Sequence, residues 1–216
     1  MKKLLALALA VVPALAATYT SDAGACGMSI RLDRTPQKPT PVQEIARAEK
    51  ALENGQGVVA AKAVLGAFPR VRGANAGDNP LETRALRVFA LAVVRSGGSV
   101  TEKSAGVPSQ AEWTPTANLE WAVQSLREID AKRPNDPTVQ ANLGEALSKI
   151  PARQGEAMTI LQGLAQKDLM GSPHAYAALA SLRGQKGDSA GALAALKRCE
   201  EMSKVPGVCR PVAAKV

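Results

Sequence analysis

Aromatic side chains and histidine are scarce in this chain of 216 residues. It contains two each of Phe, Trp and Tyr, and one histidine, His174. A single histidine excludes metal sites built on a histidine pair and argues against a Ser-His-Asp triad. So few rings provide no row of aromatic side chains on which the bases of single-stranded nucleic acid could stack. We therefore expect no metal, no cofactor and no nucleic-acid partner, and we expect His174 to lie exposed in the first turn of a helix.

Motifs of catalysis are missing as well. The sequence has neither a Gly-x-Ser-x-Gly elbow nor a phosphate-binding Gly-x-x-x-x-Gly-Lys loop. Residues 184–188, Gly-Gln-Lys-Gly-Asp, look like a nucleotide loop but join two predicted helices rather than a strand and a helix. Glu145 and Lys149 are four residues apart on one predicted helix, which favours a local ion pair over a catalytic couple. The sequence thus predicts a protein that is not an enzyme.

Cysteine is also rare, and no Cys-x-x-Cys motif occurs among the three cysteines. Cys199 lies on the last predicted helix, and Cys209 follows the turn 205–207, so the tail can fold back and form a Cys199–Cys209 disulfide in an oxidising compartment. The alternative for Cys199 is a small apolar core residue. Cys26 remains as a free thiol, a lipidated cysteine or the partner of a cysteine in another protein.

The one long apolar run is at the start of the chain. Lys2 and Lys3 precede the apolar residues 4–17, a pattern typical of a secretory signal peptide and too short to span a bilayer. Small residues allow cleavage after Ala16 or after Ala25, with a slight preference for the second. We expect a signal peptide at 1–25, an extended arm at 26–40 and a periplasmic or secreted protein. Lipid anchoring in the envelope through Cys26, which would associate the protein with a membrane, is the alternative.

The formal net charge of +8 favours anionic partners. The basic residues are interspersed with acidic ones, however, as on an ordinary solvated helix face. Charge-driven binding of an anionic envelope polymer or lipid head group is therefore the second hypothesis for function.

Residues 136–203 contain the same pattern twice, about 36 residues apart. Each copy begins with a capping residue and a proline, Asp136-Pro137 and Ser172-Pro173, which together start a helix. A first apolar helix, a polar break and a second helix with small residues follow in each copy. This spacing predicts a pair of antiparallel helices that cross closely.

Two further starts lie upstream, at Thr40-Pro41 and Asn79-Pro80. They extend the pattern to about four helical hairpins over 41–203, followed by a tail at 204–216. Residues 96–112 interrupt the second hairpin. We expect this insertion to be flexible because residues 103–106 offer nothing to bury, and the alternative is a flap anchored by Trp113.

The repeat of 136–203 resembles that of the tetratricopeptide (TPR) family in its length, its small residues in each helix and its boundary proline. The resemblance implies an all-α, right-handed solenoid of antiparallel helical hairpins whose concave groove binds a peptide or protein. It implies a non-enzymatic protein-binding scaffold of the bacterial cell envelope. The groove-facing residues that it implies are Arg84, Val88, Thr138, Ala141, Glu145, Lys149, His174, Ala177, Ser181 and Gln185.

Overall fold

The computed structural model describes residues 38–109 and 111–210. Within these ranges every regular element is helical, which confirms the all-α prediction, and no helix is long and apolar enough to cross a membrane. The predicted signal peptide, most of the predicted arm, Cys26 and residues 211–216 lie outside the described residues. The α-helices are α1 (Pro41–Glu53), α2 (Gly57–Ala67), α3 (Pro80–Arg95), α4 (Pro115–Lys132), α5 (Pro137–Leu147), α6 (Gln154–Gln166), α7 (Pro173–Gln185) and α8 (Ser189–Met202).

The predicted helix starts are confirmed. Thr40, Asn79, Asp136 and Ser172 are the N-caps of α1, α3, α5 and α7, and a proline follows each of them at the first helical position. Each cap side chain accepts a hydrogen bond from a free backbone N–H of the first turn. Because α4 begins in the same way at Thr114-Pro115, the cap-proline pair identifies five of the helix starts.

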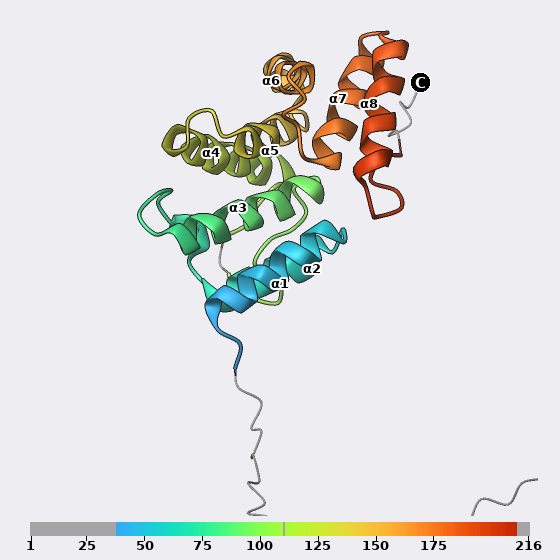
Figure 1. Ribbon diagram of the computed structural model, residues 1–216. Coiled ribbons are helices and arrows are strands. Elements are labelled where there is room, and N and C mark those ends of the chain that lie inside the picture. The colour runs from blue at the N-terminus through green and yellow to red at the C-terminus, as the bar shows by residue number, and fades with distance from the viewer. Residues whose placement is uncertain (1–37, 110, 211–216) are drawn as a thin grey trace, which may run out of the picture. The chain divides into compact units, whose positions relative to one another are not determined.

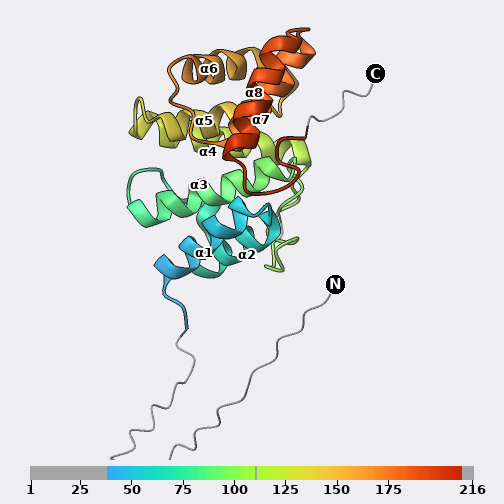
Figure 2. The ribbon, with the colours of Figure 1, turned by 45° about the vertical axis from the view of Figure 1, so that its right-hand side comes forward.

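The helices pack in the order of the chain. The pairs α1 with α2, α3 with α4, α5 with α6 and α7 with α8 are in contact, and each pair packs against the next (Figure 1). The odd-numbered helices also contact one another directly, α1 with α3, α3 with α5 and α5 with α7. Seen from a second direction, α1 and α2, then α3, then α5 and α6 again follow one another from bottom to top (Figure 2). Four odd-numbered helices therefore share one surface.

The core consists mainly of Ala, Leu and Val, as expected for helices that approach closely. The closest approach involves Gly144 of α5. A Cβ atom at this position would lie 2.7 Å from both Cγ and Cδ2 of Leu161 on α6, and Leu161 is fully buried. Gly144 thus allows α5 and α6 to pack together.

Gly144→Ala should lower the free energy of unfolding by about 1–3 kcal/mol, because the added methyl group overpacks this contact. The matched control is Gly163→Ala on α6, where the new Cβ would meet nothing within 4 Å. The control should gain up to about 1 kcal/mol from helix propensity. Urea denaturation followed by far-UV circular dichroism measures both, and equal stabilisation of the two variants would contradict the contact.

The segment between α3 and α4 joins the core. Val100 and Ala105 are buried, so the prediction that residues 103–106 have nothing to bury is wrong at Ala105. Asn118 of α4 donates hydrogen bonds from Nδ2 to the carbonyl oxygens of Gly98 and Val100, at 2.8 and 2.6 Å. The flexibility predicted for 96–112 stays a prediction.

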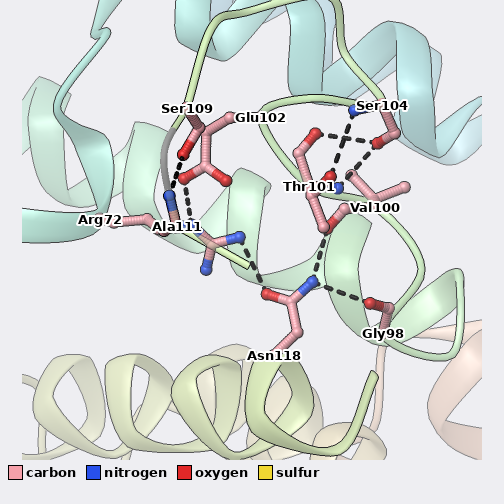
Figure 3. A network of polar contacts seen from close by, with 9 residues as sticks. All are labelled: Arg72, Gly98, Val100, Thr101, Glu102, Ser104, Ser109, Ala111 and Asn118. Carbon is pink, nitrogen blue, oxygen red and sulfur yellow. Dashed lines mark hydrogen bonds and ion pairs between the residues drawn. The ribbon is translucent and has the colours of Figure 1, made fainter. Parts of the chain in front are cut away.

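Arg72 ties this segment to the helices (Figure 3). Its guanidinium group donates to the carboxylate of Glu102 and, over 2.9 Å, to Oδ1 of Asn118. Three rings surround the same group, with centroids 4.9 Å (Phe89), 4.2 Å (Trp113) and 4.2 Å (Trp121) from its central carbon. Trp113 therefore contacts a partly buried cation, which holds the end of the segment against the helices.

Arg72→Ala should lower the free energy of unfolding by about 3 kcal/mol, since it leaves Glu102 without its partner. The emission of Trp113 and Trp121, the only tryptophans of the chain, should shift to longer wavelength as water reaches the rings. Arg70→Ala removes an exposed arginine two residues away and is the control. If the two variants have the same free energy of unfolding and the same emission wavelength, Arg72 does not hold the segment against the helices.

The predicted disulfide is confirmed. The Sγ atoms of Cys199 and Cys209 lie 2.08 Å apart, and both cysteines are buried. The bond brings residues 203–210, which we name the strap, back to the helices. The boundary predicted after residue 203 coincides with the end of α8 at Met202. Beyond it, Val208 and Cys209 of the predicted tail pack against the helices.

Candidate functional site

Two adjoining hollows lie along the surface of the odd-numbered helices. The first has a volume of about 620 Å³ and the second of about 480 Å³. Both receive residues from α1, α3, α5 and α7 and from the strap, and they share Leu52, Arg95, His174 and Val208. We refer to the two hollows together as the groove.

Six of the ten predicted groove residues line these hollows. Val88 lines the second hollow, and the first hollow is lined by Glu145, Lys149, His174, Ala177 and Ser181. The other four line neither. Ala141 is buried in the core, and Thr138 and Gln185 are exposed outside the two hollows. Arg84 forms an ion pair with Glu49.

Glu145 forms the central ion pair of the groove. Its carboxylate accepts hydrogen bonds from Nε and Nη2 of Arg95, at 2.9 and 3.1 Å, and only 2% of the residue is exposed. The predicted local pair with Lys149 is therefore wrong, because the partner comes from α3. Burial alone would raise the pKa of Glu145, but Arg95, with smaller contributions from His174 and Lys149, outweighs burial and holds the pKa below its usual value.

A second set of ion pairs lies where α1 meets α3. Glu49 accepts a hydrogen bond from Nε of Arg84 at 2.7 Å and a longer one from Arg87 at 3.4 Å. The hydrogen bond from Arg84 is the main reason that the pKa of Glu49 lies below its usual value. Two arginines that line the groove, Arg87 and Arg95, are thus engaged by glutamates, and so is the neighbouring Arg84.

His174 lies between the two hollows and is partly buried, so the prediction of an exposed histidine is wrong. Burial lowers its pKa to about 4, and Arg95 and Lys149 act in the same direction while Glu145 opposes them. His174 is therefore neutral near neutral pH and can donate or accept one hydrogen bond within the groove.

Three of the four residues that line both hollows escaped the sequence analysis. Arg95 is the last residue of α3 and looks like an ordinary basic helix end, and Leu52 fits the apolar stripe of α1. Val208 lies in the predicted tail, and its only signal was the nearby Cys209. Each is placed by contacts between segments that are distant in sequence.

The groove combines apolar surface with hydrogen-bonding and charged side chains. In the part of the chain that the structure describes, no group of three or more His, Cys, Asp and Glu side chains could hold a metal ion. The groove offers instead small side chains such as Ala177 and Ser181 beside paired charges. Such a surface suits a polypeptide better than a small charged metabolite.

Comparisons with known proteins add no relative. No model of a known protein family matches the chain, and neither the curated proteins nor the solved structures searched contain a match.

The free energy of unfolding should fall as the pH drops from about 6.5 to about 5. The unfolded chain protonates His174 near its ordinary pKa of 6.5, whereas the folded chain resists protonation down to about 4. In this range the free energy of unfolding should change by at most about 1.4 kcal/mol per pH unit. In this window few carboxyl groups titrate, so His174→Gln should remove most of the slope measured by urea denaturation.

The imidazole resonance of this single histidine provides an independent check. An NMR titration midpoint near the ordinary value in the folded protein would show that His174 is solvated and would contradict its burial.

Proposed function

We propose that this protein is a non-enzymatic scaffold that binds an extended peptide or a segment of a partner protein along the groove of α1, α3, α5 and α7. The single observation that carries the proposal is the row of adjoining hollows along helices that lie side by side. The helical pairs, their cap-proline starts and the 36-residue repeat support a TPR-like solenoid as the fold in which this groove lies.

The chemistry of the lining supports a polypeptide ligand. Val58 and Ala177 provide apolar contacts, and Ser181 and neutral His174 provide hydrogen-bonding groups. An extended peptide needs both, because its side chains alternate while its backbone amides still require hydrogen-bond partners. Since Arg87 and Arg95 are already paired with glutamates, net charge contributes less to the groove than its shape.

Charge-driven binding of an anionic envelope polymer or lipid head group remains the second candidate. Among the described residues no acidic side chain pairs with Lys149 or Arg210, and both line the first hollow. Two basic side chains at one end of the groove favour a partner with an acidic end. They do not form the extended basic surface that a polymer requires.

The environment that we propose is the bacterial envelope. The Cys199–Cys209 disulfide is consistent with an oxidising compartment. The basic start and apolar run of the sequence support export, and the disulfide agrees with the periplasm or the extracellular space as the location of the folded chain.

Selection from a phage-displayed library of random peptides tests the groove directly. Enriched peptides, made synthetically and labelled, should bind with an affinity that Ser181→Tyr reduces at least about tenfold, because the ring fills the first hollow; this corresponds to about 1.4 kcal/mol. The matched control is Ser189→Tyr, the same change at an exposed position at the start of α8. Fluorescence polarisation measures both variants, and circular dichroism confirms their folding.

Salt separates the two candidates. Groove binding should persist at about 0.5 M salt, where exposed charges are strongly screened, whereas binding to an anionic polymer should disappear. Equal losses in Ser181→Tyr and Ser189→Tyr, or a complete loss with salt, would contradict the groove.

A further inference from the structure

The strap lies against the groove and separates its two hollows. Val208 lines both hollows and packs against the hydrophobic core, while Val205 lines the second hollow and Arg210 the first. Pro206 and Gly207 form the turn that directs the chain back to the helices, and Gly207 has φ of +100°, which glycine adopts readily. One aliphatic side chain of the protein itself therefore occupies the centre of the groove.

The strap is weakly attached to the groove. Its hydrogen bonds stay within the strap or reach the end of α8: Ser203 Oγ to the carbonyl of Val205, Val205 N to Ser203 Oγ, Arg210 N to the carbonyl of Gly207, and Ser203 N to the carbonyl of Cys199. Between the strap and α1, α3, α5 or α7 the described residues form no hydrogen bond and no ion pair. The strap is held by apolar contact at Val208 and by the disulfide at the next residue, Cys209.

A side chain held by apolar contact alone can be exchanged for another of the same kind. Val208 shares the lining of both hollows with Leu52 of α1, His174 of α7 and Arg95, whose guanidinium group is already engaged by Glu145. Val208 packs against the hydrophobic core, so a charged side chain at its position would lose hydration. A small branched aliphatic side chain has the size and the apolar character of Val208 itself.

We propose that Val208 marks the central subsite of the groove, and that a partner peptide binds by placing a valine or isoleucine side chain there in exchange for Val208. This inference rests on the proposed peptide-binding function. The disulfide sets the strength of the competition, because it keeps Val208 close to the subsite and so raises its effective concentration against any partner.

The strap's own sequence provides a defined probe. A synthetic peptide of residues 203–210 carrying Cys209→Ser should bind the full-length, disulfide-bonded Val208→Ser protein, and its binding to the unmodified protein should be at least about tenfold weaker. The same peptide with Val208→Asp should not bind. Chemical-shift changes of the His174 imidazole report on the subsite itself. Absence of binding to Val208→Ser protein, or binding without a change at His174, would overturn the subsite.

Peptides selected from the library test the exchange with a partner. Val208→Ser should tighten their binding at least about tenfold, and Cys199→Ser/Cys209→Ser should tighten it in the same direction. Leu193→Ser, a change at a residue of α8 that is 67% exposed, is the control and should have no effect. Unchanged affinity in both strap variants would overturn the competition.

The strap-peptide and library-peptide experiments distinguish a failure of the proposed function from a failure of the proposed subsite. If no peptide is enriched but the strap peptide binds Val208→Ser protein at His174, the proposed function fails while the subsite stands. If enriched peptides bind with the same affinity to unmodified and Val208→Ser protein, the function stands and the subsite proposal fails.

Discussion

The ion pair between Arg95 and Glu145 joins two helices at the floor of the groove. Both charges are removed from water, which is costly unless their hydrogen-bonding groups are satisfied. Here both carboxylate oxygens accept a hydrogen bond from the guanidinium group. Because α3 and α5 belong to different helical pairs, this contact fixes one pair relative to the next, and it defines the surface from which the two hollows are formed.

The same pairing determines what the groove can recognise. An arginine whose Nε and one Nη are already bound to a carboxylate has little left to offer an anionic ligand. His174 contributes no charge at neutral pH because burial lowers its pKa to about 4. What the groove presents is therefore aliphatic surface, a few hydroxyl and amide groups, the side chains of Lys149 and Arg210 in the first hollow, and those of Glu53 and Lys204 in the second. Selectivity must come from shape and from hydrogen bonds to a peptide backbone.

The helix starts could be predicted because they depend on neighbouring residues. The site was predicted only in part, because it is formed by contacts between residues that are distant in sequence. The cap-proline starts at Thr40, Asn79, Asp136 and Ser172 are determined by neighbouring residues, and so is the tail that Cys209 returns to Cys199. The partner of Glu145, by contrast, is 50 residues away. Nothing in the spacing of Glu145 and Lys149 distinguishes a pair within one helix from a pair between helices. Ala105 is buried for the same kind of reason: a neighbouring segment covers it.

Two irregular segments contact the helices, and they are held by different interactions. The segment before α4 is bound by Asn118, by the Arg72 to Glu102 ion pair and by stacking of Trp113 on the Arg72 guanidinium. Releasing it would expose several buried polar groups at once, so it behaves as part of the scaffold. The strap has one aliphatic side chain in the groove and a covalent bond beside it. Its displacement breaks no hydrogen bond to the groove, which makes it the segment that a competing ligand can displace at the lowest cost.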